Sequence, residues 1–330
     1  MFQGKRILFF SANFFGYQNE IRRKLSEMGA EVDFFDERPK NTFWYKALIR
    51  LDKRLMNKRI GAYYQDIIDS TRRNRYDYVF FLKAEVITAQ KMEQLKAAHP
   101  ESVFLLYMWD SIRNCPSVTG LFSFFDRIYS FDRKDVLANG HLKFRPLFYL
   151  DDYAEIPAVA KPTYEISFIG TGHSDRYKLV MQVKRICEEN GWKYFLFLYL
   201  QDIRVFYYRK IATPGFKKAR KSDFSFQPLG KEAILGHIED TRCVLDIERP
   251  VQVGLTMRTI EVLGACRKLI TTNADIVHYD FYNPDNIQII DRKNPEIPES
   301  FIRAPYTPVD EEVYASYSIG SWLREIFMEQ

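Results

Sequence analysis

Short runs of strand-forming residues alternate with longer amphipathic segments along the first half of the chain. Residues 7–10 are four consecutive apolar residues, as expected for a strand buried on both faces of a sheet. We predict further strands of similar length at 32–35, 78–82, 103–107 and 127–130. Helical spacing is clearest over 18–28, which ends at a capping Gly29, and over 88–98. Strands that alternate with helices predict a parallel, doubly wound α/β sheet.

The pattern breaks near residues 147–163, where a pair of aspartates and two prolines interrupt it. It restarts with a strand at 166–169 and a helix over 176–190. More strands are predicted at 194–200, 243–247, 268–272 and 287–290. We therefore predict two Rossmann-like domains that face a central cleft. The N-terminal domain spans 1–150, a linker spans 151–163, and the C-terminal domain spans 164–330.

Composition narrows the class of protein. A chain of 330 residues that is 46% hydrophobic and 28% charged can build folded cores, which excludes disordered and low-complexity classes. The net charge of +5 is too small for a dedicated nucleic-acid binder. The four cysteines lack the paired spacing of zinc or redox motifs, and the N-terminus lacks the apolar run of about 7–15 residues that a signal peptide needs. We therefore expect a cytoplasmic protein.

A glycine turn follows the first strand of the second half. Gly170, Thr171 and Gly172 come directly after the strand at 166–169, and His173 and Arg176 open the next helix. Backbone N–H groups of such a turn, together with the positive end of a helix, can hold a phosphate. The third glycine of the dinucleotide fingerprint is absent, so the alternative is a tight turn without a ligand.

A second candidate follows the strand at 243–247. The strand leads to Glu248 and Arg249, and a helix then opens with hydroxyl and guanidinium groups, carried by Thr256, Arg258 and Thr259. These groups suit a diphosphate. Glu261 shares a helix face with Arg258 and is placed to accept hydrogen bonds from ribose hydroxyls. The alternative is a surface ion pair between the two residues.

The segment 254–265, the strand at 268–272 and the later residues 279–284 resemble the donor-binding half of GT-B glycosyltransferases, in particular bacterial enzymes of capsule, exopolysaccharide and lipopolysaccharide assembly. This resemblance covers roughly residues 244–292. It implies a nucleotide-sugar donor in the C-terminal domain, with Glu261 on the ribose and Thr256, Arg258 and Thr259 on the diphosphate. It implies neither a cofactor nor a metal ion, because helix ends and basic side chains neutralise the phosphates.

One position departs from this family pattern. Many retaining members carry a second carboxylate where this chain has Val253. Glu248 is the substitute that the sequence offers, so the stereochemical outcome of transfer stays open.

In the N-terminal domain, the resemblance implies the acceptor site and the catalytic base. Asp110 follows the strand at 103–107, at the sheet edge where open α/β sheets bind ligands. We predict that it is the base; the alternative is a helix N-cap. Residues 36–37 are the second choice for the base. Asn13, Phe14 and Gly16, after the first strand, are predicted to frame the acceptor pocket.

Two basic stretches, 43–59 and 204–221, contain interleaved aromatic residues. They fit an anionic membrane surface, which suits a transferase with a lipid-linked acceptor; the alternative is a solvated helix face. The resemblance implies a glycosyltransferase of the hexosyltransferase class, and two other functions compete with it. One is a nucleotide-sugar epimerase of the same fold, and the other is a non-enzymatic nucleic-acid or membrane-binding protein. The balanced charge argues against nucleic acid as a partner.

Overall fold

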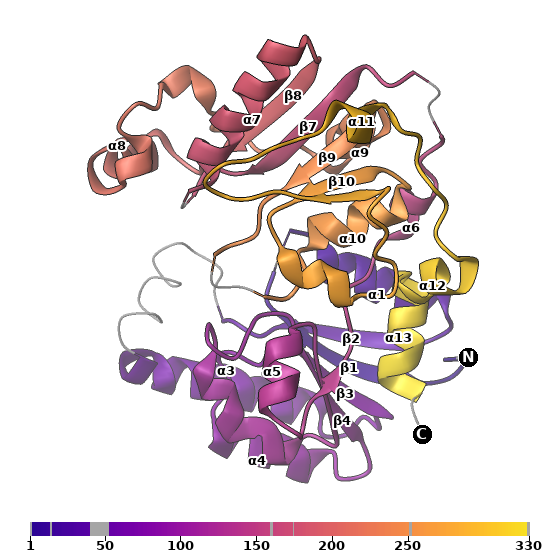
Figure 1. Ribbon diagram of the computed structural model, residues 1–330. Coiled ribbons are helices and arrows are strands. Elements are labelled where there is room, and N and C mark those ends of the chain that lie inside the picture. Colours follow the sequence, from indigo (N-terminus) through magenta and orange to yellow (C-terminus); the bar gives the residue numbers. More distant parts are fainter. Residues whose placement is uncertain are drawn as a thin grey trace. The chain divides into compact units, whose positions relative to one another are not determined.

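The computed structural model describes residues 2–13, 15–39, 53–158, 161–173, 175–250 and 253–328. It divides into an N-terminal unit, Met1–Pro146 with Ile319–Gln330, and a C-terminal unit, Leu147–Ser318. Each unit contains a parallel sheet with helices (Figure 1), which confirms the predicted α/β class with two Rossmann-like halves. The unit boundaries differ from the predicted domains. Helix α13 (Ile319–Met328) belongs to the N-terminal unit, and part of the predicted linker is helix α6 (Asp151–Ala154) of the C-terminal unit.

The N-terminal sheet has the strand order β2-β1-β3-β4-β5-β6, and all of its pairs are parallel. Its strands are β1 (Arg6–Ser11), β2 (Glu31–Asp36), β3 (Tyr78–Leu82), β4 (Val103–Met108), β5 (Arg127–Ser130) and β6 (Lys143–Phe144). Its helical segments are α1 (Tyr17–Glu27), α3 (Lys53–Thr71), α4 (Ala89–Ala98), η1 (Pro116–Phe124), α5 (Arg133–Ala138) and α13. The two-residue β6 is the strand that the hydrophobic pattern did not predict, because it is too short to form a run.

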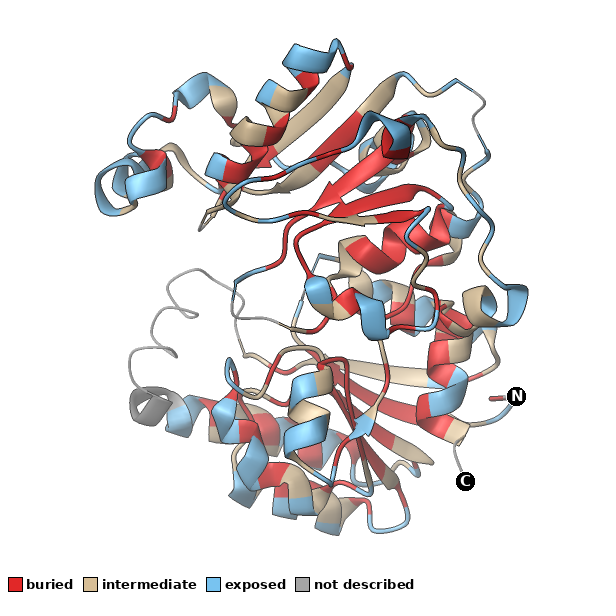
Figure 2. Cartoon of the chain, viewed as in Figure 1, coloured by how far each residue is buried: buried red, intermediate tan, exposed pale blue. Residues whose placement is uncertain are grey.

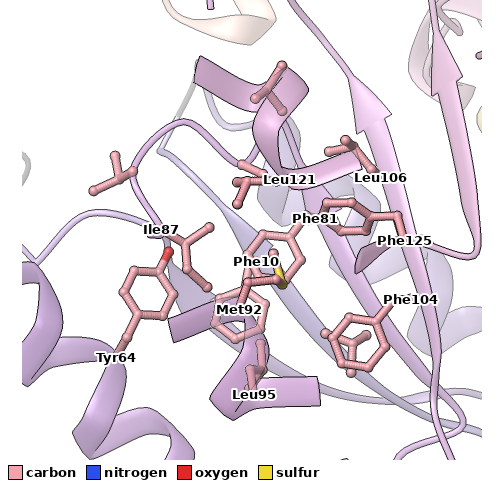
Figure 3. Close-up of a cluster of buried hydrophobic side chains, with 14 of the residues drawn as sticks. Phe10, Tyr64, Phe81, Ile87, Met92, Leu95, Phe104, Leu106, Leu121 and Phe125 are labelled. Carbon is pink, nitrogen blue, oxygen red and sulfur yellow. The ribbon is translucent and has the colours of Figure 1, made fainter. Parts of the chain in front are cut away.

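Alternate residues of the central strands build two cores. Phe10 and Phe81 face α3, α4 and η1, where their rings stack with centroids 4.4 Å apart. Figure 3 shows this cluster, with Tyr64 from α3 and Met92 from α4 lying beside the strands. This alternation explains why the strands are apolar throughout: each face of the sheet is covered by helices.

The opposite face of the same sheet is covered by α1 and by the C-terminal helix α13. The fully buried Trp322 lies edge-on to Tyr107 of β4, with centroids 4.7 Å apart, and Phe327 packs on Phe80 of β3. Arg145 lies 3.1 Å from the carboxylate of Glu325. The last helix is therefore an integral layer of the N-terminal unit.

The C-terminal sheet has the order β11-β10-β9-β7-β8, again fully parallel. Its strands are β7 (Tyr164–Thr171), β8 (Tyr194–Tyr199), β9 (Thr241–Asp246), β10 (Lys268–Thr271) and β11 (Ile287–Ile289). Its helical segments are α6, α7 (Arg176–Asn190), α8 (Ile203–Ala212), η2 (Pro214–Phe216), η3 (Lys221–Asp223), α9 (Lys231–Glu239), α10 (Met257–Gly264), η4 (Ala274–His278), α11 (Glu299–Arg303) and α12 (Glu311–Ser316). Gly191 ends α7 in the left-handed region, with φ of 66°, a conformation that glycine adopts without steric cost.

Burial follows the layers of each unit. The strands and the inner faces of the helices are buried, whereas α8 exposes most of its surface (Figure 2). Within the described part of the chain, no helix is long and apolar enough to cross a membrane.

Candidate functional site

The glycine turn after β7 is fixed by aromatic packing. A Cβ on Gly170 would lie 2.7 Å from the ring of Phe168, and one on Gly172 would lie 2.7 Å from the ring of Phe224. The N–H of Gly172 donates to the carbonyl oxygen of Tyr199 at 2.8 Å, and the N–H of His173 donates to Thr171 at 3.0 Å. Because these two amides are already paired, side chains rather than the turn's backbone carry most of its capacity to bind an anion.

Arg176, the first residue of α7, connects this turn to the end of β9. Its Nε donates to the carbonyl oxygen of Ile247 at 2.6 Å, and its Nη1 lies 3.5 Å from that of Thr171. Since β7 and β9 are neighbours in the sheet, the arginine joins the two loops in which the sequence predicts donor-binding residues.

Four basic side chains interact electrostatically near these two loops. Burial, with the charges of Arg176, Arg249 and Arg209, lowers the pKa of His173 to about 3. Burial, with the charge of Arg249, also lowers the pKa of Arg209. For Arg176, burial and the cations Arg249 and Arg292 outweigh Asp246 and Glu248 and lower its pKa. Three of these groups, Arg176, Arg209 and Arg249, carry positive charge, and His173 with its low pKa is neutral near pH 7. We define the four residues together as the cationic cluster. Mutual repulsion in such a cluster is relieved by a bound anion.

The carboxylate of Glu248 is held by other side chains of the C-terminal unit. Its carboxylate accepts hydrogen bonds from Thr272 and from Arg292, the latter at 3.3 Å, and the residue is buried. Burial raises the pKa of this carboxyl despite both donors. Glu248 therefore does not offer the free carboxylate that many retaining members of the family carry at the position of Val253.

The hydroxyls predicted to meet a diphosphate are also engaged. Thr256 and Thr259 donate to the same oxygen of Asp246, at 2.6 and 2.7 Å. Thr256 also caps α10, because its oxygen accepts the N–H of Thr259 at 3.3 Å. In this structure, the two threonines fix the start of α10 to the end of β9.

Arg258 and Glu261 form an ion pair 2.8 Å long within α10. The pair is not a surface feature: the side chains are only 17% and 4% exposed. Tyr153 of α6 interacts with both partners, and burial together with Glu261 raises the pKa of its phenol well above the ordinary range. Glu261 is thus part of a buried polar group, and its predicted contact with a ribose stays a prediction.

In the N-terminal unit, the parallel strands bring the predicted acceptor and base residues to one edge of the sheet. Asp110, after β4, accepts from Ser111 N and Asn114 Nδ2 at 3.1 and 2.7 Å, and from Lys83 Nζ at 3.1 Å. Lys83 follows β3 with a φ of 92°, an uncommon conformation for a residue other than glycine and a pointer to function. Burial opposes the charge of Lys83, but Glu85 and Asp110 outweigh it and raise its pKa.

The remaining predicted acceptor residues follow β1. The Asn13 side chain accepts from Gln18 Nε2 at 2.8 Å, and Gly16 precedes α1 with a φ of 85°. Phe14 lies outside the described residues. Trp109 packs on Tyr17 of α1, with centroids 5.6 Å apart, and places an aromatic side chain at the same edge.

Glu37, the second choice for the base, is completely buried. One carboxyl oxygen accepts the N–H of Glu85 at 3.1 Å, and the other has no hydrogen-bond partner among the described residues. Burial raises the pKa of Glu37 to about 7, with Glu85 adding to the effect and Arg38 and Lys83 opposing it. A group enclosed in this way titrates near neutral pH but does not reach a substrate.

Sequence reasoning missed several members of these groups. Arg209 was assigned to a membrane-facing stretch, because nothing local shows that α8 folds back beside the glycine turn. Lys83 was missed because its partner Asp110 follows a different strand. Asp246 lies at the end of its own strand, but the sequence does not show that Thr256 and Thr259 at the start of α10 both donate to it. A polar residue at the end of a buried strand was the available signal.

We expect Glu37→Gln to remove a pH dependence of stability. The folded pKa of about 7 exceeds the usual 4.5, so the unfolded state loses this proton first as the pH rises. Stability therefore falls between about pH 4.5 and 7, by on the order of 3 kcal/mol. The amide carries no charge, so the variant should gain stability relative to wild type at pH 8 and little at pH 4.5, as measured by urea unfolding. Equal pH profiles for Glu37→Gln and the exposed control Glu101→Gln would contradict this.

No protein family and no curated protein matches the sequence. Solved structures do match it over nearly its whole length. HepE from Anabaena, in complex with UDP and glucose, superposes with a TM-score of 0.61 at 9% identity, over 98% of this chain and 99% of that one. A glycosyltransferase from Rickettsia africae gives 0.58 at 11% identity, over 99% of both chains.

A UDP-GlcNAc 2-epimerase from Methanocaldococcus jannaschii also matches, with a TM-score of 0.53 at 9% identity, over 98% of this chain and all of that one. At such identities the similarity concerns the fold. Together with the two parallel sheets described above, it shows that the chain has the GT-B fold.

Proposed function

We propose that the protein is a glycosyltransferase that moves a sugar from a nucleotide-diphosphate donor to a surface-polysaccharide or lipid-linked glycan. The C-terminal unit binds the donor, and the N-terminal unit binds the acceptor. The GT-B fold supports this assignment, and solved neighbours of the same fold carry UDP, glucose or UDP-glucose.

The cationic cluster is the observation that carries the proposal. Its side chains gather at the carboxyl ends of β7 and β9, where open α/β sheets bind ligands. A diphosphate leaving group develops negative charge as the sugar bond breaks, and fixed positive charge there lowers the barrier. In this proposal the basic side chains take the role of a metal ion. Asp246 with its two threonines holds α10 in place. Glu261, which is paired with Arg258, is the proposed partner of the ribose, and Arg258 is the proposed partner of the diphosphate.

The acceptor side of the proposal rests on Asp110. The acceptor hydroxyl attacks the anomeric carbon, the bond to the diphosphate breaks, and the carboxylate takes the hydroxyl proton. Lys83 is a positioning residue, because its ammonium donates to one carboxylate oxygen of Asp110 and fixes the orientation of that carboxylate. Asn13, Gly16 and Trp109 surround the same sheet edge and are proposed to frame the acceptor.

We also propose that α8 contacts an anionic membrane. Tyr207, Tyr208 and Ile211 are 56%, 71% and 85% exposed, and Arg204 and Lys210 lie beside them in the helix. Exposed aromatic and aliphatic side chains among basic ones suit the headgroup region of an anionic leaflet. Most of the other basic stretch, 43–59, lies outside the described residues.

Donor binding is tested by thermal shift against a panel of nucleoside diphosphates and nucleotide sugars. A ligand at about a hundredfold excess over its dissociation constant stabilises the fold by about 2.7 kcal/mol. We expect one nucleotide to raise the melting temperature of wild type, and Arg249→Gln to reduce that shift. Arg249 is exposed and makes no hydrogen bond or ion pair with another described residue, so the substitution should leave the fold intact. Arg185→Gln, on α7, is the control. No shift with any nucleotide would refute donor binding.

Incubation of the shifting nucleotide sugar without acceptor separates the two enzyme classes. Conversion to an epimer under these conditions would favour the epimerase, whereas transfer that depends on a glycan acceptor supports the transferase.

Asp110→Asn is expected to lower glycosyl transfer by about 10²- to 10⁴-fold, since the amide accepts no proton. The nucleotide-induced thermal shift should stay at the wild-type value, because the donor site lies in the other unit. Asp69→Asn, an exposed aspartate of the same unit, is the control and should keep its activity. Full transfer activity in a folded Asp110→Asn variant would remove Asp110 as the base.

Membrane contact is tested by co-sedimentation with vesicles that contain phosphatidylglycerol, beside vesicles of phosphatidylcholine alone. We expect binding to the anionic vesicles only, weakened by salt and lost when Tyr208 and Ile211 are both replaced by serine. The matched control is Leu137→Ser, at an apolar residue that is 81% exposed and lies in the other unit. Equal sedimentation of the control and the double variant would exclude α8 as the contact.

A further inference from the structure

Helix α8 is attached to the glycine turn by a cluster of aromatic rings. The buried Phe206 packs on Phe224, with centroids 5.6 Å apart, and Phe224 stacks on Tyr177 in the first turn of α7 at 5.3 Å. Phe224 also occupies the space beside Gly172 where a Cβ would lie. The segment from α8 to η3 is therefore held against the loop that carries His173, although Figure 1 shows α8 at the outer side of its unit.

Arg209 lies on the side of α8 that this packing covers. Its guanidinium carbon is 5.8 Å from the ring centroid of Phe216, and its Nε is buried without a hydrogen-bond partner among the described residues. The next residue, Lys210, differs: its Nζ donates to the carbonyl oxygen of Ala219 at 3.1 Å. The hydrogen bond of Lys210 therefore closes the segment between α8 and η3. Arg209, by contrast, has a buried Nε without an acceptor in the described part of the chain, and a buried donor of this kind destabilises a folded protein.

Arg209 interacts electrostatically with two other members of the cationic cluster, His173 and Arg249. It lowers the pKa of His173, and the charge of Arg249 in turn lowers its own pKa, after burial. No carboxylate is among the described groups that act on the pKa of Arg209. By contrast, Arg204 at the start of the same helix pairs with Asp202 at 2.9 Å. A half-buried guanidinium that lies near another arginine, and whose Nε has no hydrogen-bond partner among the described residues, is stabilised by a bound anion.

We propose that Arg209 is a ligand of the donor diphosphate, brought into the donor site by the aromatic packing of α8. This inference rests on the proposed function and adds a third chain segment to the site, beside the glycine turn and the end of β9. Arg209 supplies a donor fork that suits phosphate oxygens, and the ring of Phe216 holds the guanidinium in place. One helix then serves both proposed contacts, with Arg209 inside and Tyr208 and Ile211 outside.

The test measures the affinity for inorganic pyrophosphate by isothermal titration calorimetry. We expect Arg209→Gln to weaken binding by about 10- to 100-fold, because a charged hydrogen bond to phosphate is lost. Arg209→Lys should recover part of the affinity. Arg204→Gln, on the same helix with a side chain that is 88% exposed, should bind as wild type does. Equal affinity of Arg209→Gln and Arg204→Gln would overturn the proposal.

A second measurement needs no ligand and separates binding from packing. We expect the pKa of His173, followed by NMR and assigned with His173→Gln, to rise in Arg209→Gln, since one nearby cation is removed. It should not move in Arg204→Gln. An unchanged pKa in Arg209→Gln would show that Arg209 acts only on Phe216, which would overturn the proposal.

The two experiments also distinguish this inference from the proposed function. If wild type binds pyrophosphate through Arg209 but no nucleoside diphosphate, the transferase proposal fails and the anion site stands. If nucleoside diphosphates bind equally to wild type and Arg209→Gln, the donor site stands and Arg209 is excluded from it.

Discussion

The hydrogen bond from Arg176 to the carbonyl oxygen of Ile247 decides which residues of the C-terminal unit can act together. Parallel strands place their carboxyl ends on one edge of a sheet, but the loops that follow are free to diverge. Arg176 prevents this by spanning from the start of α7 to the end of β9. Two further arginines, Arg249 and Arg292, then act on its guanidinium beside the carboxylates of Asp246 and Glu248, so the fold holds like charges together where it could have separated them. Proteins tolerate such an arrangement chiefly at sites that receive an anion.

Much of the architecture could be predicted because the central strands are buried on both faces and leave apolar runs in the sequence. Each predicted strand overlaps an observed one, and the helices over 18–28, 88–98 and 176–190 are confirmed. The assignment of α13 could not be predicted. Residues 319–328 read as an amphipathic helix, but nothing in their spacing tells which sheet their apolar face covers. That choice depends on Tyr107 and Phe80, more than two hundred residues earlier in the chain.

The candidate site, like the fold, has features that the sequence predicts and features that it does not. Arg249 and Asp110 could be predicted to lie at the sheet edge because each follows a buried strand, and position along the chain then implies position on that edge; their roles in binding and catalysis stay predictions. The hydrogen bonds of the site residues could not be predicted from the sequence. Thr256 and Thr259 have the residue types of phosphate ligands, yet the hydroxyls of both donate to the carboxylate of Asp246. Arg209 shows the opposite case: its sequence context is that of a surface helix, and only the rings of Phe216 and Phe224 place it among the cations.

The position of α13 has a consequence for biosynthesis. The apolar face of the N-terminal sheet that includes Phe80 and Tyr107 stays uncovered until the ribosome has made all of Leu147–Ser318. At 5–20 residues per second, this takes on the order of ten seconds or more. The C-terminal unit is continuous in sequence and can complete its core within that time. The first sheet to be translated is therefore the last to be finished, and its open face is a natural substrate for chaperones that bind nascent chains.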